Sequence, residues 1–193
     1  MKKLLTTISC LLLITSLQAG NTLKRTPSVA VIPQPARMTV GDKVFTLRAA
    51  TPICLLAEAP ELAYAAELLN RTLAPVLGGE LPVSDVRREK GILLSLSPAM
   101  RPEAYELKVA PRGVTITAGS PAGAFYACQT LLQLCPADLT AAAGAAAVQI
   151  PCVEIEDAPA FDLRGMMLDV ARHFFTVGEV KELLDLLAMH KIN

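Results

Sequence analysis

The sequence contains no tryptophan, only two histidines, and few aromatic residues, which make up 4% of its 193 residues. It also lacks an excess of charge of either sign, since 18 Lys and Arg are balanced by 18 Asp and Glu. Nucleic-acid-binding domains usually carry a basic surface, and interaction tails carry runs of like charge. The composition therefore argues against a nucleic-acid partner and against attraction to an anionic membrane.

Spacings typical of metal ligands are missing as well. The sequence has no CxxC pair, and its only histidines are His173 and His190, so we expect no zinc site and no cofactor. Cys128 and Cys135 lie seven residues apart in an expected helix, which separates their Cα atoms by about 10 Å, beyond disulfide reach. We expect these two thiols to act as small buried apolar groups.

The first 19 residues have the pattern of a secretory signal peptide. Two lysines precede an apolar stretch over residues 4–17, and small residues follow at Ala19 and Gly20. The stretch is short of the roughly 20 residues that span a bilayer, and no later segment is longer, so no transmembrane span is expected after cleavage. We expect export to the bacterial periplasm, to the outer surface or to the medium, with a lipoprotein signal at Cys10 as the alternative.

Residues 20–35 contain the prolines of an extended linker, and residues 36–158 predict a small α+β domain with a mixed or antiparallel sheet and two helices. One helix is expected over residues 61–77, where apolar residues recur every three or four positions before two glycines. Ser120 and Pro121 predict the start of the second helix, as N-cap and first helical residue. The expected strands cover residues 38–47, 52–56, 91–97, 104–110 and 113–118.

Two expectations concern the order of this sheet. Residues 91–97, 104–110 and 113–118 are expected to form its antiparallel part, the last two as a hairpin. Residues 148–155 are extended but contain Pro151, which cannot donate a ladder hydrogen bond, so we expect them at an edge or in a connection.

Residues 159–193 predict one strand followed by one helix. The apolar run 166–168 is typical of a strand that is buried on both faces. Thr176 and Glu179 form the pattern of a capping box, and a helix with one apolar face follows, lined by Val180, Leu183, Leu184, Leu187 and Ala188. Because a (β/α)8 barrel needs eight such units, we expect an incomplete barrel and a chain that is a fragment.

Four polar residues interrupt this strand-helix unit: Arg164, Asp169, Arg172 and His173. Barrel active sites lie at the carboxyl ends of the strands, which is where the last three of them fall. An Asp–Arg pair that closes the strand end and a packed histidine are the structural alternatives. Spacing alone leaves both interpretations open.

The stretch FDLRGMMLDVARHFFTVGEVKELLDLLAMHKIN resembles the start of the catalytic barrel in family 20 glycoside hydrolases, the β-N-acetylhexosaminidases. The family pattern is Arg-Gly, three apolar residues, Asp, any residue, Ser or Ala, and Arg-His, and every element is present between Arg164 and His173. Residues 31–35 and 119–134 resemble parts of the small domain that precedes this barrel. Other glycosidases, including α-glucuronidases, carry a similar small domain.

The resemblance implies a glycan substrate with a terminal β-linked N-acetylhexosamine, hydrolysed with retention by attack of the substrate's own acetamido oxygen. It also implies an Asp-Glu catalytic pair further along the barrel, so we expect no catalytic residue in this chain. Glu154, Glu156 and Asp157 match no catalytic motif and are expected to be solvated charges. Arg164 is the residue that the resemblance assigns to sugar binding, although it begins its strand while barrel sites lie at the other end. The alternatives are a noncatalytic carbohydrate-associated or scaffolding domain and a glycosidase of another kind.

Overall fold

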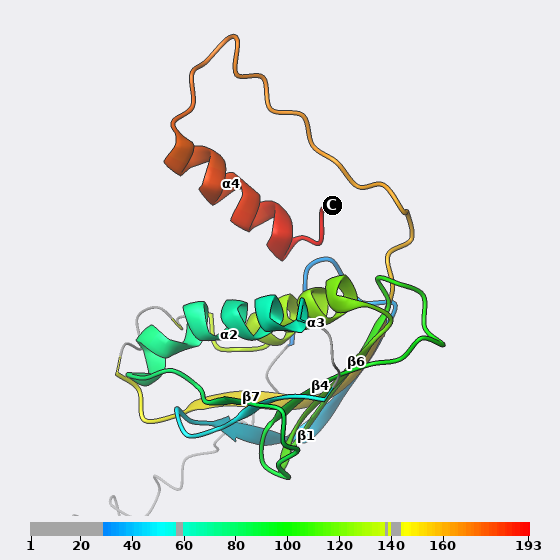
Figure 1. Ribbon diagram of the computed structural model, residues 1–193, viewed down its shortest axis with the longest axis vertical. Helices are drawn as coiled ribbons and strands as arrows, with labels where there is room; N and C mark the ends of the chain where they lie inside the picture. Colours follow the sequence, from blue (N-terminus) through cyan, green and yellow to red (C-terminus); the bar gives the residue numbers. More distant parts are fainter. Residues whose placement is uncertain (1–28, 57–59, 138, 140–143) are drawn as a thin grey trace, which may run out of the picture.

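The computed structural model describes residues 29–56, 60–137, 139 and 144–193. Two helices cover one face of a seven-stranded sheet, and a third helix lies on the outer side of those two (Figure 1). The helices are α2 (Leu62–Leu77), α3 (Pro121–Gln133) and α4 (Val177–Met189). The strands are β1 (Arg37–Leu47), β2 (Ile53–Leu55), β3 (Val83–Ser84), β4 (Ile92–Leu96), β5 (Tyr105–Ala110), β6 (Gly113–Ala118) and β7 (Val148–Asp157).

Helices α2 and α3 form where the apolar spacing predicts them. Gly78 ends α2 in the left-handed conformation (φ 71°), which only glycine adopts without steric cost. The Ser120 side chain accepts a hydrogen bond from the Gly123 amide, and Pro121 begins α3. Both helices pack their apolar sides on the sheet, and the resulting core includes Leu69, Leu94 and other fully buried side chains.

The sheet has the order β1-β7-β5-β6-β4-β2-β3. Strands β1, β7, β5 and β6 pair antiparallel, and β5 and β6 form the predicted hairpin. The expectation for residues 91–97 is wrong, because β4 pairs parallel with both β6 and β2. Strand β6 lies between β5 and β4, so these three strands do not follow one another across the sheet in chain order, as they would in a meander.

Strand β7 lies inside the sheet, between β1 and β5, so the expected edge position of residues 148–155 is also wrong. Pro151 is tolerated because the ladder between β5 and β7 begins only at Val153. On its other side, Pro151 pairs with Val44 at the point where the register of β1 shifts. The missing amide of the proline therefore falls where the ladders are already interrupted.

Beyond β7 the chain leaves the sheet in a long arc before it returns as α4 (Figure 1). Helix α4 begins with the predicted capping box between Thr176 and Glu179. The predicted strand over residues 166–168 does not form in this structure, and Met167 is 89% exposed. A strand needs a neighbour to receive its backbone hydrogen bonds, and no described segment lies beside this one. Residues 159–193 are called the strand-helix unit below, after the strand that the family motif predicts.

Cys128 and Cys135 are buried in the core with free thiols, which confirms their predicted role. Burial raises the pKa of each thiol to about 12. In the described ranges, no helix combines the length and apolar character needed to cross a bilayer. The expected signal peptide, residues 1–19, and residues 20–28 of the expected linker lie outside the described residues.

Candidate functional site

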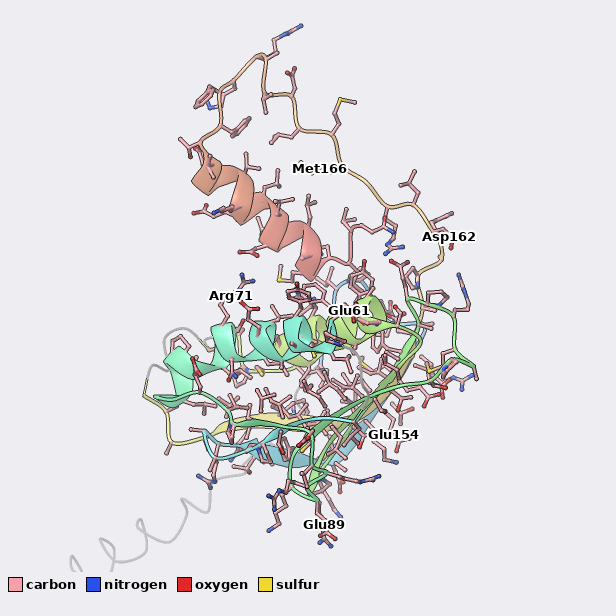
Figure 2. The ribbon with its side chains drawn as sticks, viewed as in Figure 1. Glu61, Arg71, Glu89, Glu154, Asp162 and Met166 are labelled. Atoms are coloured by element: carbon pink, nitrogen blue, oxygen red, sulfur yellow. The ribbon has the colours of Figure 1, made fainter. Side chains whose placement is uncertain are left out.

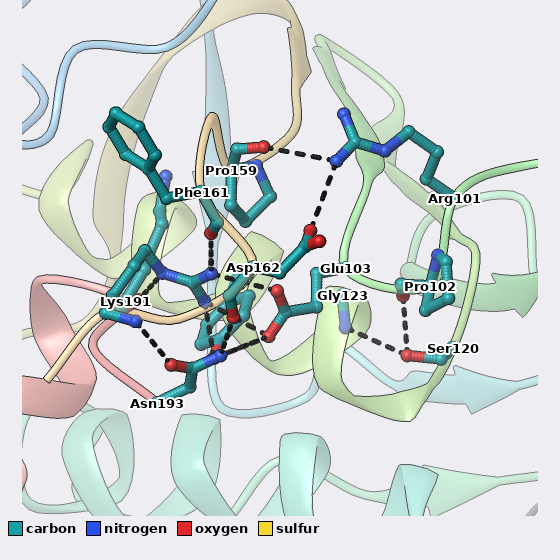
Figure 3. Close-up of polar contacts among 12 residues, drawn as sticks. Arg101, Pro102, Glu103, Ser120, Gly123, Pro159, Phe161, Asp162, Lys191 and Asn193 are labelled. Atoms are coloured by element: carbon teal, nitrogen blue, oxygen red, sulfur yellow. Dashed lines mark hydrogen bonds and ion pairs between the residues drawn. The ribbon is translucent and has the colours of Figure 1, made fainter.

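Arg164 lies between the small domain and the end of α4, and all five of its guanidinium N–H groups donate to protein acceptors. Nε donates to the Lys191 carbonyl (2.7 Å). Nη1 donates to Glu103 Oε2 (3.0 Å) and to the Phe161 carbonyl (2.7 Å), and Nη2 donates to Glu103 Oε1 (3.1 Å) and to the Tyr126 hydroxyl (3.2 Å). Figure 3 shows Glu103, Phe161, Lys191 and Asn193 close together, with dashed lines for the polar contacts among the residues drawn. An arginine with five satisfied donors has none free for a ligand.

The pair between Arg164 and Glu103 is bidentate and partly buried. The two side chains are 14% and 24% exposed. Hydrogen bonding from Arg164 lowers the pKa of Glu103 and outweighs the opposing effect of desolvation. The same contact raises the pKa of Arg164. Both groups are therefore charged at neutral pH, in a geometry that matches a guanidinium to a carboxylate.

A second pair joins the end of α4 to the sheet. Lys191 Nζ donates to Asp157 Oδ2 (2.7 Å) and to the Tyr105 hydroxyl (2.8 Å). The Tyr105 hydroxyl also lies 2.9 Å from Asp157 and 2.7 Å from the hydroxyl of Thr130 on α3. The Lys191 and Asp157 side chains are only 6% and 12% exposed.

Burial and charge act in opposite directions on this second pair. Desolvation alone would raise the pKa of Asp157, but hydrogen bonds and charge from Lys191, with help from Tyr105, lower it overall. Burial raises the pKa of Tyr105, so its hydroxyl stays protonated. Every buried side-chain N or O atom in the described residues has a hydrogen-bond partner. The network is complete within the protein.

The three predicted strand-end residues lie apart from Arg164, on the arc between β7 and α4. Asp169 Oδ1 accepts hydrogen bonds from the amides of Ala171 (2.9 Å) and Arg172 (3.3 Å). His173 packs edge to face against Phe175, with the ring centroids 4.9 Å apart. All three side chains are exposed, and the structure does not bring them together with Arg164. No group of three His, Cys, Asp or Glu side chains suited to a metal occurs in the described part of the chain.

The sequence interpretation missed the partners of these pairs. Glu154 and Glu156 are exposed, as predicted, and pair with Lys108 and Arg37. The prediction for Asp157 is wrong, because it is largely buried and paired with Lys191. Glu103 had no signal at all, since 61 residues separate it from Arg164.

Comparison with known proteins identifies the chain. Residues 28–158 match the family model described as glycosyl hydrolase family 20, domain 2, and residues 161–193 match the catalytic domain of the same family. The chain belongs to glycosyl hydrolase family 20. This result decides against the alternative of a glycosidase from another family.

Relatives and solved structures agree with the family assignment. The chain is 38% identical over 170 residues to a β-hexosaminidase from Porphyromonas gingivalis, covering 86% of this chain and 22% of that protein. It is 39% identical over 179 residues to a β-N-acetylhexosaminidase from Cellulomonas fimi, covering 86% of this chain and 34% of that protein. The structure of a family 20 β-N-acetylhexosaminidase from Streptomyces coelicolor matches with a TM-score of 0.79 and 37% identity, over 87% of this chain and 34% of that one. The chain thus spans between about a fifth and a third of the length of these proteins.

Proposed function

We propose that this chain forms the small domain and the first strand-helix unit of an exo-acting β-N-acetylhexosaminidase. The complete enzyme would release terminal, non-reducing, β-linked N-acetylglucosamine or N-acetylgalactosamine with retention of configuration, by attack of the substrate's acetamido oxygen. The observation that carries the proposal is the match of residues 161–193 to the family's catalytic domain. We further propose that the protein is exported, as its first 19 residues predict.

The 193 residues alone should not turn over substrate. A barrel site is assembled from loops that follow several different strands, and this chain contributes the segment of one. Glu103 and Asp157 are each held by a cation, so neither is placed to protonate a leaving group. A complete chemical site requires residues contributed by the rest of a barrel.

Within the motif, two arginines are candidates for the sugar contact. The resemblance assigned this role to Arg164, and the assignment remains a prediction. Its five donors are satisfied by the protein, and it precedes the strand position. Arg172 follows that position and is exposed, where barrel enzymes place their functional groups. We therefore propose Arg172 as the residue that donates to the sugar hydroxyls.

A chimera tests both parts of this proposal. The aligned residues of the Cellulomonas fimi β-N-acetylhexosaminidase would be replaced by those of this chain, and release of 4-nitrophenol from its N-acetyl-β-glucosaminide would be measured. We expect turnover by the chimera and none by the 193-residue chain. An inactive but folded chimera would favour a noncatalytic scaffolding role, and turnover by the chain alone would contradict the proposal.

Matched variants of the chimera separate the two arginines. Arg172→Lys should lower kcat/KM by about 10- to 100-fold, because a charge-assisted hydrogen bond contributes roughly 1.5–3 kcal/mol. Arg164→Lys should chiefly lower the melting temperature. The opposite result, with kcat/KM lost only in a well-folded Arg164→Lys variant, would restore Arg164 as the sugar ligand.

A further inference from the structure

Helix α4 faces the small domain with a side that carries both charged and apolar residues. At 100° per residue, Glu182, Asp185, Leu186 and Met189 share one side, and these residues line a cavity of about 670 Å³ between α4 and the two inner helices. The opposite side carries the predicted apolar face, on which Leu184 is 57% exposed. No residue of α4 is buried. Apolar burial therefore contributes little to holding this helix in place.

Polar contacts at both ends of the strand-helix unit hold it on the small domain instead. At its beginning, Arg164 is bound bidentately by Glu103. At its end, Lys191 reaches Asp157 and Tyr105 in the sheet. Asn193 joins the two ends. Its backbone N–H donates to the Arg164 carbonyl (2.9 Å), and its side-chain Oδ1 accepts from the Arg164 backbone N–H (2.8 Å).

The backbone of Lys191 indicates that its ammonium group is needed at this position. Lys191 N–H donates to the Ala188 carbonyl and Ile192 N–H to the Leu187 carbonyl, both at 3.0 Å. These are the two bonds of a Schellman motif, with Lys191 at the left-handed position (φ 59°), which is normally glycine. A side chain there strains the backbone. Glycine would end the helix with less backbone strain than lysine does. The buried ion pair with Asp157 offsets the strain at Lys191.

We infer that the Arg164–Glu103 and Lys191–Asp157 pairs form a two-point latch that positions the first strand-helix unit of the catalytic domain on the small domain. Glu103 and Asp157 are the positioning residues contributed by the small domain. The latch does not depend on the proposed substrate or on the assignment of Arg172. It concerns how the unit that carries the family motif is oriented.

Hydrogen-deuterium exchange of the full chain tests the latch. An isolated helix of 13 residues is marginal in water, so α4 amides should lose protection when the latch opens. Lys191→Gly removes the ammonium group and relieves the backbone strain. If the latch holds α4, this variant should speed exchange of α4 amides by about tenfold or more, while the amides of β4–β6 stay unchanged. Unchanged or slower exchange in α4 would overturn the inference, because relief of strain would then dominate.

A second variant and a control complete the experiment. Glu103→Gln keeps the size of the side chain but removes its charge, and should also speed exchange in α4 without affecting the sheet. Arg71→Ala is the matched control, because the Arg71–Asp185 pair also bridges to α4 (3.1 Å) but is 63% and 65% exposed. Arg71 extends from α2 toward α4 (Figure 2). An effect of Arg71→Ala equal to that of Glu103→Gln, or loosening of the whole sheet by Glu103→Gln, would contradict a specific latch.

Discussion

The small domain and the strand-helix unit that follows it are held together by different forces. In the small domain, α2 and α3 bury apolar sides against the sheet, and Leu69, Leu94 and Ile116 have no accessible surface. In the unit, Met167 is 89% exposed and no residue of α4 is buried. Apolar burial therefore stabilises the small domain, whereas a few partly buried polar contacts position the strand-helix unit.

The largest expected effect is in the core of the small domain. Leu94→Ala should lower the free energy of unfolding by about 2–5 kcal/mol, because it leaves a cavity in a central strand. Leu184→Ala, on the exposed side of α4, should change it by less than about 0.5 kcal/mol. Urea titrations followed by circular dichroism measure both. Equal effects would break the comparison between the two regions.

The next effect is a loss of α4 docking in acid. Glu103 faces Arg164, Tyr126 and Asn193, and its pKa is lowered from 4.5 chiefly by hydrogen bonding from Arg164. A carboxylate with a lowered pKa stabilises the folded arrangement above its unfolded pKa, and that contribution disappears as the pH falls through the folded pKa. The contribution of Glu103 to docking should therefore be fully present at neutral pH and be lost progressively as the pH falls below 4.5.

The contribution of Asp157 to docking should also be lost in acid. Its pKa is lowered from 3.8 because Lys191, Tyr105 and the Ala36 amide together outweigh desolvation. Amide chemical shifts of α4, recorded by NMR from pH 7 downward, should move toward random-coil values as the pH falls below 4.5 for the contribution of Glu103 and below 3.8 for that of Asp157. The sheet shifts should stay in place. The Glu103→Gln variant should lose the part of this transition due to Glu103. A transition centred near pH 6 would point to a histidine instead.

Among the polar contacts, the smallest effect should come from exposed ion pairs. Arg37 and Glu156 bridge β1 and β7 at 3.0 Å, with side chains 73% and 58% exposed. Arg37→Ala should cost less than about 1 kcal/mol, because solvent screens such pairs. A thermal melt of this variant beside Leu94→Ala compares them directly. A cost above 2 kcal/mol would mean that burial is not the dominant force in the small domain.

Local features of the fold could be predicted from the sequence. The periodicity of α2, α3 and α4, the cap at Ser120 and the β5–β6 hairpin depend on residues close together in the chain. The interior position of β7 and the parallel pairing of β4 could not be predicted in this way. They are set by which strands meet across long connections, and a proline gives a misleading signal where the ladder is already interrupted.

In the candidate site, too, residues that are contiguous in the sequence could be predicted and distant partners could not. The motif around Arg164 and Asp169 was visible because it is contiguous, and it led to the family. The partners Glu103 and Asp157 were not, because they lie 61 and 34 residues from the groups they bind. An acidic residue in an exposed-looking segment cannot be distinguished from a buried ion pair until its partner is placed beside it.

Native-state hydrogen exchange on the unaltered chain measures both regions at once. In low concentrations of urea, amides of β4, β6 and α3 should exchange only through global unfolding. Amides of α4 should exchange through a separate, smaller opening with weak urea dependence, because undocking a latched helix exposes little apolar surface. If α4 and the sheet instead exchange with the same free energy and the same urea dependence, the two regions form one cooperative unit, and the distinction between a buried core and a latched unit is contradicted.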